Sequence, residues 1–534
     1  MSLSTSLGPQ CITCQKRRVK CDSSTPRCRR CARDQRNCPG YGKQRRWIAF
    51  EPTKGNVRPS ASSTSSSSCS PGPLEPVYEY VDAAKHLQVA LLDPTRSRQV
   101  FDIGVHRRDW HIAESVEYCN HILVPDLVPY PFQHQLFAAI DDWKKAPLML
   151  QSTLLVVVYN CRLVRGNTNE LVTDLYRYRG EALRELAQEV KAPSTRNPVL
   201  GLVGVLMMLQ AEIQVSCIAR WDVHLLAARR LLKGLGGLVE TWHKIPQIRL
   251  PLALYVIVDI MSTPTSPASL LIQEELDDAC NSILRLPSLE QIILASCCPV
   301  PIPILTIITQ VSSWRKRVDT FASQASGDSW KGFEASFRSA LQRLDSFDAD
   351  EWATRIIIDF PDNGSHNERK LIPFRESEVS EWAALGQCFQ SATTIYLLRS
   401  VASSGLRLHK GSAIVPDTNI EERLEDEVRT LDTTLDQLML RFGEQHPTSL
   451  RPGLWRFTMF PLVIHAFELL VWRVPSSSVQ HHCFSRMKTL GLAIGLRTMD
   501  GAIECIDQAM KRRDILGGDI RWDDLFNSRA IFVV

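Results

Sequence analysis

Apolar residues recur at helical spacing along most of the chain from about residue 77 onward. The clearest case begins after Pro416, where Thr418 and Glu421 have the S/T-x-x-E spacing of a helix capping box. The apolar positions that follow are Ile420, Leu424, Val428, Leu431, Leu435, Leu438 and Phe442. Gaps of three and four residues place such side chains on one face of a helix. The segment predicts a helix with one buried stripe that ends at Gly443. Its exposed face should carry Glu421, Glu422, Glu425, Asp426 and Asp432.

The same spacing predicts seven further helices in the C-terminal nine-tenths of the chain. They cover residues 109–123, 199–218, 221–233, 252–261, 305–315, 379–401 and 455–472. A sheet would instead show sustained alternation of apolar and polar residues, and this pattern is missing from the sequence. We therefore expect an all-α body at residues 77–534, built as one large or two intimately packed bundles.

The apolar runs predict a buried core and no membrane partner. The most continuous runs, 199–209 and 252–258, are shorter than the roughly 20 residues that cross a bilayer. A longer run at 292–308 is interrupted by three prolines. The first ten residues lack the apolar core of a secretory signal, so we expect the chain to stay in a reducing compartment.

A change of composition separates the predicted body from the N-terminal region. Residues 51–76 are rich in serine, proline and glycine. Such a segment buries too little apolar area to offset its chain entropy, which predicts a disordered linker. Its 26 residues would have an end-to-end distance of about 25–30 Å. Residues 1–50 should therefore form a separate head that turns independently of the body.

Positive charge and cysteine are both concentrated in this head. The whole chain has a net charge of +4, yet residues 1–46 hold twelve Lys/Arg and two acids, a net +10, which leaves −6 for the rest. The region 11–38 contains six of the sixteen cysteines. They form two copies of C-x2-C-x6-C at Cys11, Cys14, Cys21, Cys28, Cys31 and Cys38. Clustered cysteines in a reducing compartment favour metal binding over disulfides.

The spacing of these cysteines predicts a site for two zinc ions. A C-x2-C pair lets two thiolates reach one cation, and zinc takes four ligands in a tetrahedron. Two zinc ions need eight ligand contacts and six thiolates are available, so two sulfur atoms must bridge the metals. Few apolar residues lie among the cysteines, chiefly Ile12, Val19 and Ala32. Because this is too little for a core, zinc binding should supply most of the head's folding free energy.

A basic run lies between the second and third cysteines. Its cations are Lys16, Arg17, Arg18 and Lys20. On a short helix these side chains would suit the major groove of double-stranded DNA, where Arg and Lys donate two hydrogen bonds to guanine. The second repeat carries arginines better placed for phosphates: Arg27, Arg29, Arg30, Arg33 and Arg36. The alternative is a merely solvated cluster or a nuclear import signal, to which Lys43, Arg45 and Arg46 are equally suited.

The head closely resembles the fungal binuclear zinc cluster (Zn2Cys6) transcription factors. The resemblance rests on the six-cysteine spacing, the block at 14–22, Pro26 and the sequence at 38–41. It implies a nuclear regulator of RNA polymerase II genes that binds two zinc ions and reads CGG-like sites. It also assigns the bridging sulfurs to Cys11 and Cys28, and base contacts to Arg17 and Arg18. Gln15 departs from the basic residue that many members have.

Parts of the body resemble the helical regulatory domain of the same family. The similar segments are 221–228, followed by Gly236 and Gly237, then 392–399 and 460–462. The resemblance permits control of a metabolic or biosynthetic gene cluster, of sugar use or of nitrogen use alike, and it leaves the body to pass on a signal or to recruit partners such as the transcription machinery. Acidic and hydrophobic residues mixed at 344–362 and 522–526 could contact that machinery or belong to ordinary helices and loops.

The apolar repeat at 77–91 leaves the oligomeric state open. It comprises Val77, Tyr80, Ala84, Leu87 and Leu91. This repeat could form the coiled-coil seam of a homodimer. It spans only two heptads, so we favour docking against the chain's own body.

Enzymatic activity finds no support in the sequence. The common phosphate-binding, serine hydrolase and zinc protease motifs are missing, and His121, His224 and His465 lack partners at ligand spacing. We expect these histidines to be structural. The alternative from another class is a thiolate protein for metal buffering or redox chemistry, which would not need the arginines. A helical enzyme with a DNA-binding head would need a pocket that the sequence does not reveal.

Overall fold

The structure is a computed structural model that describes two parts of the chain. In the N-terminal part it describes residues 13, 14, 17, 19, 21, 22 and 28–34. In the body it describes residues 107–532 except 130–138, 167–169, 192–197, 218–220, 272–281, 297, 324–326, 360–372, 403–419, 445–452, 474–475, 517–519 and 529. Backbone contacts divide the chain into two units, Met1–Leu74 and Glu75–Val534. The predicted linker at 51–76 and the apolar repeat at 77–91 lie outside the described residues.

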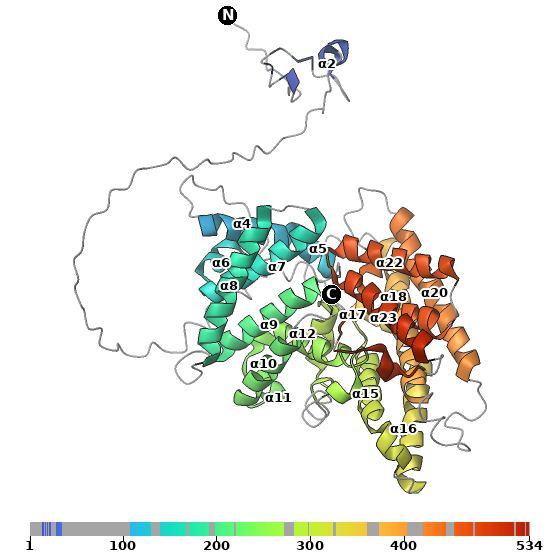
Figure 1. The fold of residues 1–534 in the computed structure, drawn as a ribbon. Helices are drawn as coiled ribbons and strands as arrows, with labels where there is room; N and C mark the ends of the chain where they lie inside the picture. Colours follow the sequence, from blue (N-terminus) through green and yellow to red (C-terminus); the bar gives the residue numbers. More distant parts are fainter. Residues whose placement is uncertain are drawn as a thin grey trace, which may run out of the picture. The chain divides into compact units, whose positions relative to one another are not determined.

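The body is all-α over its described residues, as the sequence predicts, and its first half is a group of packed helices (Figure 1). They are α4 (Arg107–Tyr118), η2 (Cys119–Leu123), α5 (Val124–Leu127), α6 (Ile140–Lys145), α7 (Leu148–Gly166), α8 (Glu170–Lys191), α9 (Pro198–Val215), α10 (Trp221–Gly234), α11 (Leu238–Lys244), η4 (Pro246–Ile248) and α12 (Arg249–Met261). Helix α7 packs against α4, α8 and α9, and α9 packs in turn against α8, α10 and α12. Helices α7 and α9 therefore form the centre of this group.

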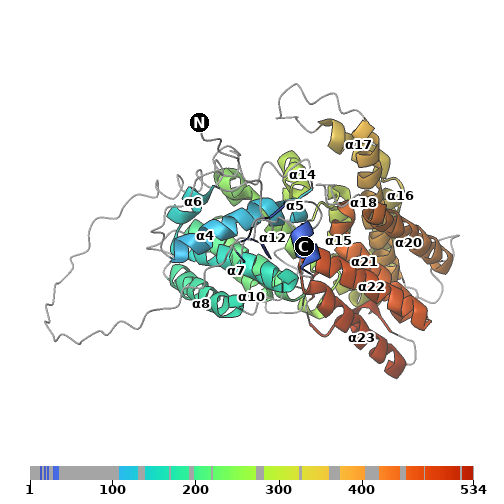
Figure 2. The same ribbon diagram turned by 90° about the horizontal axis from the view of Figure 1, so that it is seen from above.

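The second half of the body packs around one long helix, α18 (Figure 2). Its elements are η5 (Ala268–Leu270), α14 (Pro287–Leu294), α15 (Ile302–Ser323), α16 (Gly327–Asp345), α17 (Ala349–Asp359), α18 (Pro373–Leu397), η6 (Leu398–Ala402), α20 (Ile420–Glu444), η7 (Leu454–Phe457), α21 (Met459–Phe467), η8 (Glu468–Trp472), α22 (Ser477–Ile494), α23 (Thr498–Leu516) and η9 (Trp522–Leu525). Helix α18 contacts α15, α17, α20 and α21. Helix α12 joins the two halves through α14 and α15.

Helix α20 confirms the clearest sequence prediction. Its described stripe positions from Leu424 to Leu438 are buried, and the helix ends at Glu444, one residue beyond Gly443. Two of the acids expected on the exposed face have partners inside the fold: Glu421 pairs with Arg399, and Asp432 pairs with Arg486. The acidic face therefore also binds buried arginines of neighbouring elements. The predicted cap at Thr418 lies outside the described residues.

The seven other predicted helices are present, with shifted ends and a change of geometry in three of them. The segments η2, η6 and η8 are π-helical turns that continue α4, α18 and α21. A π turn adds a residue to one helical turn, and such turns occur frequently at functional sites. The spacing of apolar residues predicts the helices but not these turns.

Helix α9 is a core helix. Among the described residues it is the one helix long and apolar enough to cross a membrane by length and composition, with a mean hydropathy of 1.6 over its 18 residues. Within the fold, 61% of it is buried, beneath α7, α8, α10 and α12. This agrees with the interpretation of the run at 199–209 as part of a core.

The described parts of both acidic-hydrophobic stretches pack into the fold, whereas residues 360–362 of the first stretch lie outside the described residues. In the first, Trp352 of α17 is buried against Trp382, with ring centroids 5.7 Å apart. In the C-terminal stretch, the Trp522 indole N–H donates to the Pro264 carbonyl at 2.6 Å, and Asp523 pairs with the buried Arg315 guanidinium. Their large aromatic side chains therefore serve packing, which argues against either stretch being an exposed activation segment.

A buried arginine with two carboxylate partners allows a matched test of this packing. The Arg399 guanidinium donates to Glu468 at 2.7 and 2.8 Å and to Glu421 at 2.9 and 3.2 Å. The Glu468 side chain is fully buried, whereas that of Glu421 is 63% exposed. Removing one partner of a buried pair leaves an uncompensated charge, whereas an exposed partner contributes little.

We expect Glu468→Gln to lower the free energy of unfolding by about 3–5 kcal/mol and Glu421→Gln by about 0–1 kcal/mol. Urea unfolding of the full chain, followed by far-ultraviolet circular dichroism, measures both. Equal losses in the two variants would show that burial of Glu468 does not control this interaction.

Candidate metal centre

Three cysteine thiols meet in the head. The Cys14 sulfur lies 3.7 Å from the sulfur of Cys28 and 3.7 Å from that of Cys31, and all three side chains are fully buried. Sulfur atoms about 2.3 Å from a tetrahedral zinc lie about 3.8 Å apart, whereas a disulfide bond is about 2.05 Å long. The three thiols therefore have the separation of ligands on one zinc ion and are not disulfide-bonded.

A second group of ligand atoms shares one member with the first. The sulfur atoms of Cys21 and Cys28 and a carboxylate oxygen of Asp22 lie within 4.8 Å of one another. Cys28 thus belongs to both groups. A thiolate in this position can contact two metal ions at once, which is what six thiolates on two zinc ions require. Among the described residues, these are the two groups in which three side chains are close enough together to hold one metal ion.

Short backbone hydrogen bonds place these thiols. Cys28 caps the N-terminus of α2 (Arg29–Arg33), where its sulfur accepts from the backbone N–H of Cys31 at 3.3 Å. Both side chains of this C-x2-C pair therefore lie on the same side of the turn. In the first repeat, the Val19 N–H donates to the Cys14 carbonyl at 3.1 Å. Asp22 joins the two repeats, because its carboxylate accepts from the Arg29 N–H at 3.0 Å.

Sulfur replaces the hydrophobic core in this head. The buried cluster within its described residues consists of the three thiols, with Val19 and Cys21 packed against them. So little apolar contact is far below what a domain needs to offset its chain entropy. The described residues therefore agree with a head held together by metal–thiolate bonds.

An ion pair fixes one of the cations of the basic run. The Arg17 guanidinium donates to the Asp34 carboxylate at 3.0 Å, with both side chains about one-third exposed. This hydrogen bond holds the pKa of Asp34 below its ordinary value. The pair connects the turn after Cys14 with the C-terminal end of α2, so the orientation of Arg17 is coupled to the second repeat.

The other predicted site residues divide into two sets. On α2, Arg29 and Arg33 are exposed, and the Arg33 side chain is 79% exposed. The remaining predicted ligands and DNA contacts lie outside the described residues: Cys11, Cys38, Lys16, Arg18 and Lys20. Asp22 and Asp34 were not predicted. Their positions, directly after Cys21 and three residues after Cys31, are the signal that could have indicated them.

The histidines singled out in the body occupy different environments. His465 is buried, and desolvation lowers its pKa to about 4. Neither of its ring nitrogens has a hydrogen-bond partner, so the imidazole is buried without a hydrogen bond. His121 is exposed and lies 3.0 Å from Glu117 on the same helical face. His224 is half-buried, and desolvation lowers its pKa.

The role of metal in folding can be tested by chelation. We expect removal of zinc to unfold the head and to leave the helices of the body intact, because the body has its own apolar core. Amide NMR signals report on the head and far-ultraviolet circular dichroism on the body. Dispersed head signals in the metal-free protein would contradict the assignment of zinc as the folding determinant.

Comparisons with known proteins agree with this site and fold. Residues 146–533 match the family described as "Fungal specific transcription factor domain". Residues 10–48 match the "Fungal Zn(2)-Cys(6) binuclear cluster domain", which binds two zinc ions. Neither a curated relative nor a solved structure matches the chain. The first match covers well over half of the sequence, so the chain belongs to the fungal-specific transcription factors, with a DNA-binding head that holds two zinc ions.

Proposed function

We propose that the protein regulates RNA polymerase II genes by reading short CGG-like sequences in double-stranded DNA. The observation that carries the proposal is the buried thiol cluster with Arg17 fixed beside it. A metal core of this kind can hold a cationic turn rigidly without an apolar core. The controlled genes would be those of a metabolic or biosynthetic gene cluster, and the protein would act in the nucleus, as members of this family generally do.

We assign six zinc ligands: Cys11, Cys14, Cys21, Cys28, Cys31 and Cys38. In this assignment Cys11 and Cys28 bridge the two ions. The membership of Cys28 in both groups of ligand atoms supports its bridging role. The full burial of Cys14, Cys28 and Cys31 works against the alternative of a metal-buffering or redox protein, because exchange and oxidation need accessible thiolates.

The DNA contacts are assigned to the basic run of the first repeat. We propose that Arg17 and Arg18 contact base edges, and that Lys16 and Lys20 contact the backbone. Arginine can donate two parallel hydrogen bonds to guanine, which suits a GC-rich site. The ion pair with Asp34 supports a role for Arg17, since it orients the guanidinium before DNA arrives. The exposed Arg29 and Arg33 would contact phosphates.

The helical body would transmit regulation. Its families are generally non-enzymatic, and we propose contact with the transcription machinery rather than catalysis. Residues 47–534 carry a net charge of −6, so DNA should repel the body and leave it available to proteins. Homodimerisation through residues 77–91 stays a prediction, and sedimentation of residues 1–95 tests it.

Two substitutions separate base reading from general attraction to DNA. We expect Arg18→Ala to reduce discrimination between a CGG site and a site with one changed base by about 1–3 kcal/mol. Arg33→Ala should weaken binding to both sites equally. It should also reduce the slope of log K against log salt concentration by about one, the amount expected for one lost phosphate contact. Fluorescence anisotropy at several salt concentrations measures both effects.

A zinc-ligand variant provides the decisive control. We expect Cys14→Ser to abolish specific binding, because the basic run then loses its support. Specific DNA binding that survives this substitution would refute the proposed mechanism. A loss of discrimination with Arg33→Ala that matches the loss with Arg18→Ala would refute the division between base and phosphate contacts.

A further inference from the structure

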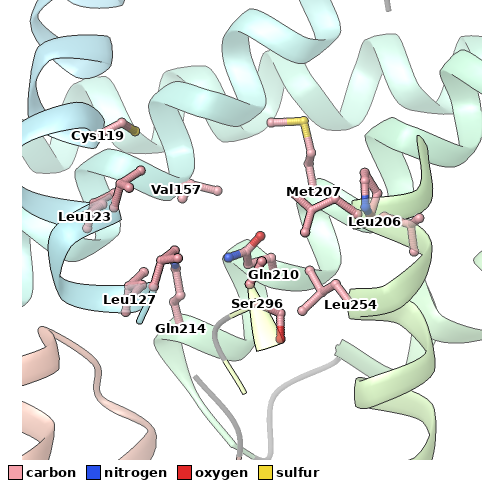
Figure 3. Close-up of a pocket in the computed structure, with 15 residues that line it drawn as sticks. Cys119, Leu123, Leu127, Val157, Leu206, Met207, Gln210, Gln214, Leu254 and Ser296 are labelled. Carbon is pink, nitrogen blue, oxygen red and sulfur yellow. The ribbon is translucent and has the colours of Figure 1, made fainter. Parts of the chain in front are cut away.

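The first half of the body contains a cavity of about 260 Å³ that is open to solvent on one side (Figure 3). Its walls come from η2, α5, α7, α9 and α12 and from residues 295 and 296 after α14. Eleven of the fifteen lining side chains are apolar, among them Leu123, Leu127, Val157, Leu206, Met207 and Leu254. A cavity of about 150 Å³ with such a lining holds benzene. The space here is therefore enough for a molecule of about ten to fifteen non-hydrogen atoms.

Few polar groups line this cavity, and none of the fifteen lining residues carries a charged side chain. The Ser296 hydroxyl already donates to the Ile293 carbonyl at 2.5 Å and accepts from the Cys298 N–H at 3.2 Å. The remaining strongly polar groups are the amides of Gln210 and Gln214. They lie one turn apart on α9, the helix whose residues Leu206 and Met207 share the same wall.

Gln214 has an unusual position for a buried amide. Its side chain is 2% exposed, and neither its amide nitrogen nor its amide oxygen has a hydrogen-bond partner. Both atoms are buried, so a molecule in the cavity reaches them only after the Gln214 side chain turns toward it. Buried polar groups are nearly always paired, because an unpaired donor or acceptor loses its hydration without compensation. The backbone around it is fixed, since the Gln214 carbonyl accepts from the Arg497 N–H at 3.2 Å and the Ile213 carbonyl accepts from the Thr498 hydroxyl at 2.8 Å.

The wall opposite α9 contains a second irregularity. The π turn η2 interrupts the run from α4 into α5, and two of its residues, Cys119 and Leu123, line the cavity. In Figure 3 the Gln210 amide projects into the space between Leu123, Val157 and Leu254. π turns occur frequently at functional sites, and ligand sites are largely apolar pockets with a few polar groups, so both features agree with a binding site.

We propose that this cavity binds a small, neutral, largely apolar molecule that carries a carboxamide or lactam group. Such a group offers at least one N–H and one C=O, which complement the Gln210 amide that projects into the cavity and, once its side chain turns toward the ligand, the unpaired donor and acceptor of Gln214. A charge placed inside the cavity would be disfavoured by its desolvation cost, because the lining supplies no opposite charge. The inference concerns the helical body and does not depend on the proposed DNA contacts.

The probe is 4-phenylbutanamide, with butylbenzene as the matched compound that lacks the amide. Binding to the zinc-loaded full chain is measured by isothermal titration calorimetry without DNA. We expect the amide to bind to the wild-type protein. In Gln214→Met, which keeps the side-chain length and removes the amide, the affinity ratio of 4-phenylbutanamide to butylbenzene should fall at least tenfold.

Further variants locate the probe and guard against misfolding. The ligand-free Gln214→Met protein should melt at or above the wild-type temperature, since it no longer buries an unpaired amide. Leu254→Trp fills the cavity and should abolish binding of both compounds. Leu492→Trp places the same side chain on an exposed position outside the cavity and should leave binding unchanged.

Three results would overturn the proposal: failure of the amide to bind to the wild-type protein, an unchanged affinity ratio in Gln214→Met, and unchanged binding in a folded Leu254→Trp variant. DNA binding is measured in parallel on the same variants. Because the cavity lies in the helical body, these variants should keep specific DNA binding, and a failure of the ligand proposal is thereby distinguishable from a failure of the proposed DNA-binding function.

Discussion

The sulfur atoms of Cys14, Cys28 and Cys31 form the buried centre of the head, where a larger domain would have apolar side chains. The fold of the head depends on this cluster. Their separation of 3.7 Å is repulsive for thiolates alone and favourable once zinc lies between them. The metal thus provides the free energy that so few apolar contacts cannot. It also determines where the cations lie, because the turn after Cys14 is followed at once by Arg17 and its partner Asp34.

The body is stabilised in a different way. Its large apolar core is crossed by arginine–carboxylate pairs that join elements far apart in the sequence: Arg229 with Asp259, Arg315 with Asp523, and Arg399 with Glu468. Arg229 and Arg399 pair with fully buried carboxylates, whereas the Asp523 carboxylate is 40% exposed. A buried ion pair contributes little net stability, but removal of one partner is strongly destabilising. The same body contains an open cavity lined in part by Gln214, whose buried amide is unpaired.

Much of this organisation could be predicted from the sequence. The stripe from Leu424 to Leu438 fixes one helical face, and the spacing of Cys14, Cys28 and Cys31 specifies a metal site. The periodicity did not indicate helix α7, because this helix is buried on nearly every side and includes buried polar residues such as Gln151 and Asn160, so it shows no clear apolar stripe. The role of Asp34 depends on a contact between the two repeats, and the unpaired amide of Gln214 depends on neighbours from several helices. Local patterns carry no information on such contacts.

We propose that two zinc ions share thiolates of the head. Zinc K-edge X-ray absorption on the full chain tests this claim most directly. It should show two zinc ions per chain, each with four sulfur ligands at about 2.3 Å, and scattering from one zinc by the other, because bridging sulfurs hold the metals close together. A single zinc per chain, nitrogen or oxygen among the ligands, or a spectrum without zinc–zinc scattering would contradict the account.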